Sequence, residues 1–109
     1  MDIYSALADP NRRNIIELLA SKGKLSATDI SDKFKITPPA ISQHLKVLRE
    51  AKLVTMEKRA QQRIYQINTL KIKEIEKWIK KLTEAWDARF TMLDRLLERE
   101  KLKKGGGRS

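Results

Sequence analysis

The stretch from Leu70 to about Lys101 constrains the fold most, because it contains neither proline nor glycine. Its apolar side chains recur at alternating intervals of about three and four residues, a spacing that predicts one long helix. On so small a monomer this stripe would leave a large adhesive surface, so we expect a partner helix to cover it. A twofold homodimer is the simplest arrangement. The side chains that we assign to this interface are Ile72, Ile75, Ile79, Leu82, Trp86 and Leu93.

Upstream of this helix, three segments combine a helix-capping side chain with a favourable first turn. These starts are Asp9-Pro10, Thr37-Pro38 and the capping-box pattern from Ser26 to Asp29. Together with apolar residues at helical spacing, they predict helices at 10–22, about 26–34 and about 37–51, with a short helix before Asp9.

Between the fourth helix and the long last helix, β-branched and aromatic residues at 53–58 and 63–67 predict two short strands. The polar segment from Arg59 to Gln62 joins them, so we expect a hairpin with a basic tip. The fold class is therefore mainly α with a small β-hairpin and a long C-terminal dimerisation helix. We expect one domain over 1–102 and a disordered basic, glycine-containing tail over 103–109, because that tail cannot bury apolar surface.

Composition excludes several classes of function. The chain has no cysteine and a single histidine, so disulfides, thiolate metal sites and cysteine nucleophiles are ruled out. It also has no phosphate-binding glycine loop and no evident pair of catalytic acids, so we expect no enzyme activity, no cofactor and no metal. There is no apolar run of roughly 20 residues and no basic leader, which favours a cytoplasmic protein without a membrane partner.

The formal net charge of +10 arises from 24 basic and 14 acidic residues and favours a polyanionic partner, either nucleic acid or an anionic membrane surface. The helices at 26–34 and 37–51 are joined by only a few residues, as in a helix-turn-helix, whose second helix enters the major groove of DNA. In a twofold dimer the two copies would lie about 34 Å apart and match a palindromic operator in double-stranded DNA. The predicted DNA contacts are Thr37, Pro38, Pro39, Ser42, Gln43, Lys46 and Arg49 on this helix, and Lys58, Arg59, Gln61, Gln62 and Arg63 on the hairpin.

Two segments carry a specific family resemblance: residues 6–13, Ala-Leu-Ala-Asp-Pro-Asn-Arg-Arg, and residues 39–54, which begin Pro-Ala-Ile-Ser-Gln-His-Leu-Lys. They resemble the ArsR-type family of bacterial and archaeal repressors over about residues 3–82. The resemblance implies a dimeric winged helix-turn-helix repressor, sometimes an autorepressor without a known small-molecule effector. It also implies that the fourth helix reads DNA, with His44 facing the groove, and that the first and last helices form the dimer interface, which adds Ile3, Tyr4 and Leu7.

The sequence departs from the metal sensors of that family. Those proteins place a cysteine pair in the third helix or acidic and histidine ligands in the last, whereas Ala27 to Ser31 lack cysteine here and the last helix lacks histidine. The chain is therefore similar to a metal-free branch. Relatives usually have glycine in the wing turn, but this chain has Ala60-Gln61-Gln62, so the geometry of the turn stays open.

Several alternatives stay open at this point. His44 contacts DNA or packs against the third helix, and Arg12 and Arg13 reach a phosphate or form surface ion pairs. Trp78 and Trp86 line an effector pocket or simply pack in an interface. The main alternative function is non-specific architectural DNA binding, and a protein-interaction module is a further one.

Overall fold

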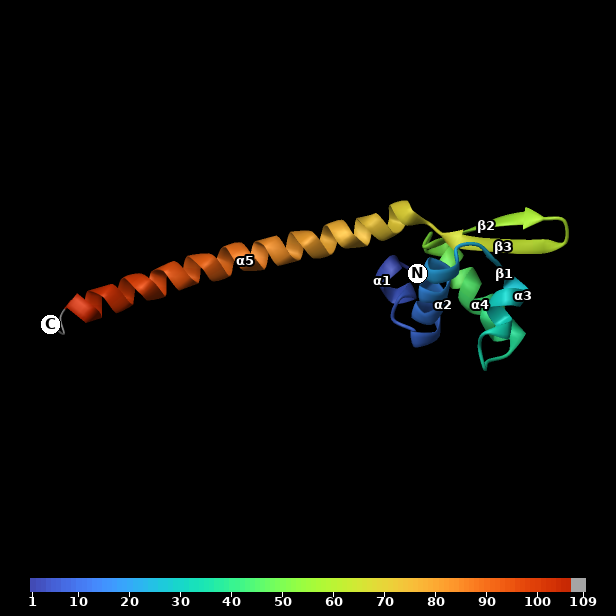
Figure 1. Ribbon diagram of the computed structural model, residues 1–109, viewed down its shortest axis with the longest axis horizontal. Helices are drawn as coiled ribbons and strands as arrows, with labels where there is room; N and C mark the ends of the chain where they lie inside the picture. The colour runs from blue at the N-terminus through green and yellow to red at the C-terminus, as the bar shows by residue number, and fades with distance from the viewer. Residues whose placement is uncertain (107–109) are drawn as a thin grey trace. The chain divides into compact units, whose positions relative to one another are not determined.

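The computed structural model describes the backbone of residues 1–106 and the side chains up to Lys101 (Figure 1). The chain divides into two compact units, one from Met1 to Lys73 and one that begins at Glu74, and each is described by itself. The first unit contains the helices α1 (Ile3–Ala6), α2 (Pro10–Lys22), α3 (Ala27–Asp32) and α4 (Pro38–Glu50). It also contains the strands β1 (Leu25–Ser26), β2 (Val54–Arg59) and β3 (Gln62–Ile67), and α5 (Thr69–Gly106) starts at its end.

The capping signals predicted from the sequence all operate at the helix starts. The Asp9 carboxylate accepts hydrogen bonds from the backbone amides of Asn11 at 2.8 Å and Arg12 at 3.1 Å. The Thr37 hydroxyl accepts from the amide of Ala40 at 3.3 Å, and the capping box at the start of α3 is complete. The predicted starts of α2, α3 and α4 are therefore confirmed, with each capping residue immediately before its helix.

Helix α3 ends at Asp32, two residues before the predicted boundary. The amides of Lys33 and Phe34 donate to the carbonyls of Ile30 and Ser31, three residues back, at 3.0 Å and 3.2 Å. This tightened last turn is common at helix ends and is not encoded by the apolar spacing.

The predicted hairpin is confirmed, and it belongs to a three-stranded antiparallel sheet with the order β1-β3-β2. In Figure 1 the end of the hairpin extends beyond the helices. The sequence analysis missed β1, which pairs Leu25 with Tyr65 and Ser26 with Ile64. Two residues are too few to show the alternation that marks a strand.

The core of the first unit lies between the helices and the sheet. Burial of each large aliphatic side chain contributes about 1.5–3 kcal/mol, so this core holds α4 and the hairpin on one scaffold. The side chains less than 2% exposed are Ile15, Leu19, Ile30, Ile41, Leu45, Leu48, Leu53 and Val54.

Helix α5 extends further than the sequence predicts. It continues to Gly106, so residues 103–106 of the predicted disordered tail are helical, and residues 107–109 lie outside the described residues. Lysines 103 and 104 are good helix formers, and α-helical hydrogen bonds can then extend into the first glycines. Every described side chain from Glu76 to Lys101 is exposed, and the second compact unit begins at Glu74. None of the described helices is long and apolar enough to cross a membrane.

Candidate nucleic-acid interface

Helix α4 separates its residues into a buried face and a polar face. Ile41, Leu45 and Leu48 are at most 1% exposed and fix the helix against the core. On the other side the helix exposes Thr37, Pro38 and Pro39 at its start and Ser42, Gln43, Lys46 and Arg49 along its length. Hydroxyl and amide side chains of this kind can both donate to and accept from base edges in the major groove.

Two arginines of α2 contact backbone carbonyls, which the sequence analysis did not predict. The Arg12 guanidinium donates to the carbonyls of Ala6 at 2.6 Å and Ser5 at 3.3 Å, and Arg13 donates to the carbonyls of Leu7 at 2.7 Å and Ala8 at 3.0 Å. Both side chains therefore satisfy carbonyl groups at the end of α1 and just beyond it. Neither arginine has an ion pair within the described residues, and a cation near the C-terminus of a helix is favourable.

His44 is half-buried, and its Nδ1 lies 3.3 Å from a terminal nitrogen of Arg12. Two residues along a helix correspond to about 200° around its axis, so His44 lies far from the side that carries Ser42. This geometry favours packing over a contact in the groove, with α2 rather than the third helix as the partner.

The capping carboxylate of Asp9 is close to the same cluster. Burial raises the pKa of Asp9, but hydrogen bonds from the amides of Arg12 and Asn11, and then the charges of His44 and Arg12, lower it by more. The net result is a pKa below the ordinary value of an aspartate. Asp9 therefore stays ionised and keeps α2 capped at neutral pH.

The hairpin of β2 and β3, called the wing from here on, divides its tip residues between two faces. Lys58 pairs with Arg63, in register with Met56 and Tyr65 on the same face. Arg59 pairs with Gln62 on the opposite face, where the Arg59 Nε lies 3.5 Å from a carboxylate oxygen of Glu57. Of the three basic residues predicted as wing contacts, Lys58 and Arg63 thus share the face that carries buried Tyr65.

The wing turn is closed by two residues, Ala60 and Gln61, without glycine. Ala60 has a φ of 54°, in the left-handed region that glycine occupies more readily. The turn is therefore tight, and it accepts backbone strain at Ala60.

The polar face of α4 and the wing together line an open cavity with a volume of about 370 Å³, which we call the α4–wing hollow. It brings together five predicted contacts of α4 and one of the wing. The predicted contacts that do not line it are Thr37, Pro38, His44, Lys58, Arg59, Gln61 and Gln62. The lining residues are Ala27, Pro39, Ser42, Gln43, Lys46, Arg49, Arg63 and Tyr65. Sequence reasoning missed Tyr65, because an aromatic residue in a strand is typical of core packing.

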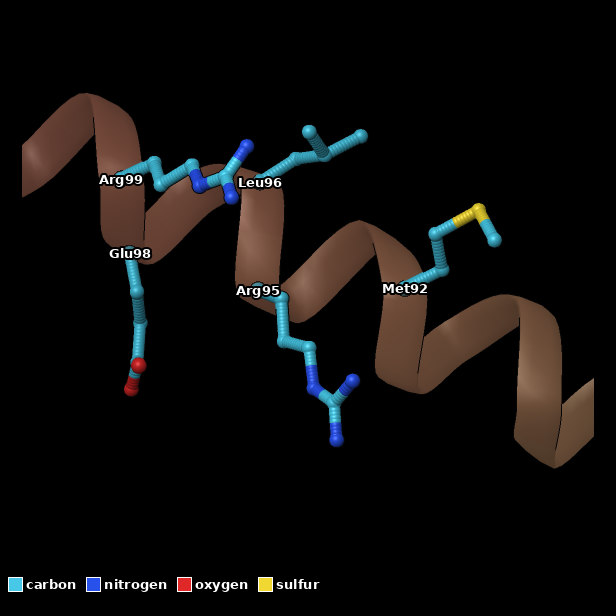
Figure 2. A pocket seen from close by; sticks show the side chains of 5 residues that line it. All are labelled: Met92, Arg95, Leu96, Glu98 and Arg99. Atoms are coloured by element: carbon cyan, nitrogen blue, oxygen red, sulfur yellow. The ribbon is translucent and has the colours of Figure 1, made fainter.

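A second hollow, of about 380 Å³, lies on α5 and has no features of a binding site. Figure 2 shows Met92 and Leu96 on one side of the helix and Arg95 and Glu98 on another, all pointing away from it. Side chains that diverge from a single helix cannot enclose a ligand. Within the described residues, no three histidine, aspartate or glutamate side chains come together as metal ligands.

A helix-turn-helix followed by a basic wing, with polar side chains on the exposed face of the second helix, defines a winged helix-turn-helix regulator of transcription that binds specific DNA sequences. Comparison with known proteins supports this class. Residues 9–56 match the family model described as bacterial regulatory protein, arsR family. The chain belongs to this family, and its function is regulation of transcription rather than catalysis.

The relatives include the transcriptional repressor SdpR of Bacillus subtilis, 33% identical over 78 residues, which cover 72% of this chain and 86% of SdpR. A solved structure described as an ArsR family transcriptional regulator superposes with a TM-score of 0.71 at 26% identity, covering 78% of this chain and 87% of that one. Another, described as a possible transcriptional regulator for arsenical resistance, gives a TM-score of 0.68 at 32% identity, with 75% and 84% covered. The predicted family and fold class are thereby confirmed.

Proposed function

We propose that the protein is a homodimeric transcriptional repressor that binds a palindromic operator in the cytoplasm, where bacterial and archaeal DNA lies. The observation that carries this proposal is the α4–wing hollow. It joins base-reading side chains, Ser42 and Gln43, to three cations without an acidic side chain in its lining. A face of this composition attracts the DNA backbone and can discriminate between bases. The relative SdpR, described as a repressor, supports repression as the outcome.

Dimerisation is supported by the exposed apolar side chains of α5. Ile79, Leu82 and Leu93 are 51%, 51% and 53% exposed, and Trp86 is 66% exposed. They follow the heptad positions that pack against another helix in coiled coils. Tyr4, predicted at the same interface, is 46% exposed on α1, and Ile3, Leu7, Ile72 and Ile75 are partly exposed. A second copy of the chain would cover these side chains and place two α4 helices on one side of the duplex.

Selection of bound sequences from a random duplex pool tests operator recognition directly. The expected product is an inverted repeat whose half-sites are one helical turn apart, bound by two copies of the chain. Sedimentation of the protein with the selected duplex gives the number of copies. Enrichment of no sequence, or a single subunit on an asymmetric site, would contradict the proposal.

Two substitutions then separate reading of bases from binding of the backbone. The wild type should bind the selected duplex more tightly than a duplex changed at one base pair. Gln43→Ala should reduce this difference in binding free energy by about 1–3 kcal/mol, because it removes a direct base contact. Arg63→Ala should weaken binding to all duplexes alike. It should also reduce the slope of binding against salt concentration by about the amount that one phosphate contact contributes. Equal losses for Gln43→Ala on the selected and random duplexes would remove Gln43 from the reading face.

The alternative is an architectural protein that binds DNA without reading it, for which the net charge of +10 would suffice. Competition against random duplex at physiological salt distinguishes the two functions. A repressor should prefer its operator by at least about a thousandfold, whereas an architectural protein should show almost no preference. A reporter gene placed behind the selected operator then shows whether binding lowers transcription.

A further inference from the structure

The α4–wing hollow gathers positive charge that nothing in its lining neutralises. Lys46 and Arg49 enter it from α4 and Arg63 from β3, and none of its lining residues is acidic. The nearest carboxylate on the wing, that of Glu57, lies on the opposite face and is close to Arg59. Like charges brought together in this way repel one another, and a bound anion would relieve the repulsion.

The hollow also contains a tyrosine whose hydroxyl has no partner among the residues described. Tyr65 is 5% exposed, yet within the described residues no hydrogen bond involves its hydroxyl. No side-chain oxygen or nitrogen that is fully buried lacks a partner in the described part of the chain, so this hydroxyl keeps an opening to solvent, and Tyr65 lines the hollow. Buried tyrosine hydroxyls normally find a partner, which makes this one an available donor.

We propose that the α4–wing hollow is a phosphate site, in which the Tyr65 hydroxyl donates a hydrogen bond to a phosphate of the DNA backbone held by Lys46, Arg49 and Arg63. This inference rests on the proposed function, because DNA supplies the phosphate. It assigns to Tyr65 a role in binding that its position in a strand does not suggest.

The position of Tyr65 suits a fixed contact. It lies in the central strand of the sheet, where its backbone is paired with Leu25 of β1 on one side and Met56 of β2 on the other. The two ladders therefore fix the backbone that carries the ring, and burial of the ring, which is 5% exposed, restricts its rotation. A donor held in this way loses little conformational entropy when it binds, unlike the long side chains of lysine and arginine around it.

A phosphate fits the three cations and Tyr65 of the hollow better than a base edge does, whereas Ser42 and Gln43 are the residues that we assign to bases. Phosphate oxygens only accept hydrogen bonds, and the hollow offers three cations and the neutral tyrosine donor around one space of about 370 Å³. Because its walls come from both α4 and the wing, a phosphate held there would fix both elements against the backbone. Such a contact sets the register of the protein on DNA and contributes equally to all sequences.

The test compares Tyr65→Phe with Thr55→Val on the DNA selected with the wild-type protein. Tyr65→Phe keeps the buried ring and removes only the hydroxyl, and Thr55→Val removes an exposed hydroxyl from the other face of the wing. Tyr65→Phe should weaken binding about tenfold on selected and random duplexes alike, as expected for a hydrogen bond to a charged acceptor. Its salt dependence should stay unchanged because no charge is lost, whereas Arg63→Gln should lower the slope. Thr55→Val should bind as the wild type does.

Thermal unfolding serves as the check on structure. Because the Tyr65 hydroxyl has no hydrogen bond to any residue that the structure describes, Tyr65→Phe should unfold at the wild-type temperature. A marked loss of stability would show that the hydroxyl supports the fold, and would overturn its assignment to phosphate.

Duplexes with a single methylphosphonate locate the contact. At one position in each half-site, replacement of the charged phosphate should weaken DNA binding by the wild-type protein. It should also abolish the difference in affinity between the wild type and Tyr65→Phe. If Tyr65→Phe binds the operator as tightly as the wild type does, the phosphate site is wrong although the repressor function stands. A third outcome is that the wild-type protein binds no DNA but the NMR resonances of Tyr65 shift when pyrophosphate is added. The ligand of the hollow would then be a free anion, and both the DNA phosphate site and the proposed function would be wrong.

Discussion

Replacement of Lys52 by glycine should stabilise the protein, although the substitution removes a side chain. Lys52 follows α4 and has a φ of 63°. Its amide donates to the carbonyl of Arg49 at 2.9 Å, and the amide of Leu53 donates to the carbonyl of Leu48 at 3.0 Å. This pair of bonds is the Schellman motif, in which glycine is the usual residue at the left-handed position.

The size of the effect follows from two opposing terms. A residue with a Cβ costs roughly 1–2 kcal/mol in the left-handed region. Glycine avoids this cost, but it makes the unfolded chain more flexible and so favours unfolding by about 0.5–1 kcal/mol. Both hydrogen bonds involve backbone atoms and survive the substitution, so Lys52→Gly should gain about 0.5–1 kcal/mol. For a unit of this size that corresponds to an increase in Tm of about 2–6 °C.

The assay is urea unfolding at one fixed protein concentration, since association would otherwise change the apparent stability. Lys52→Ala is the matched control, because it removes the same charge and the same long side chain but keeps the Cβ. It should show little or no gain. Equal stabilisation by alanine and glycine would refute the reasoning from backbone conformation and assign the effect to the charge.

Three further predictions concern the end of α1, the cap of α2 and the face of α5. Arg12→Ala should lower the free energy of unfolding by about 1–3 kcal/mol, because the carbonyls of Ala6 and Ser5 lose their donor. Urea unfolding measures this loss, and an unchanged free energy would contradict the contacts. The lowered pKa of Asp9 implies stability that is present above the unfolded-state pKa of about 3.9 and lost as pH falls through the lower folded-state value. The urea midpoint of Asp9→Asn should therefore fall less steeply than that of the wild type below about pH 4, and parallel curves would exclude Asp9 as a source of the acid sensitivity. Leu82→Glu should yield single subunits in sedimentation velocity, whereas Thr91→Glu, on the outer side of the heptad pattern, should leave the dimer intact.

The sequence was most informative where a structure depends on neighbouring residues. The capping residues Asp9, Ser26 and Thr37 act within one helical turn, so the starts of α2, α3 and α4 were predictable. The hairpin was predictable because its two strands are adjacent along the chain. Strand β1 pairs with residues about forty positions further on, and such a pairing leaves no local pattern in two residues.

The interface was predictable as a set of exposed residue types, but its geometry was not. Helical spacing placed Ser42, Gln43 and Lys46 on one face of α4. Only the register of the hairpin shows that Arg63 shares a face with Tyr65 and that Arg59 does not. Arg12 could not be understood from sequence either, since its acceptors are backbone carbonyls, which every residue has.

The junction after α4 explains how two elements can act as one reading surface. The side-chain amide of Asn68 donates to the carbonyl of Lys52 at 2.9 Å, and its backbone amide donates to the carbonyl of Leu53, also at 2.9 Å. These bonds tie the end of β3 to the end of α4, and Leu53 and Val54 are at most 1% exposed where the wing begins. Both strands of the wing are therefore fixed at their base to α4, the helix that we propose reads DNA. A surface whose parts are already fixed loses less conformational entropy on binding, so the proposed contacts of Gln43 with bases and of Arg63 with the backbone would reinforce each other.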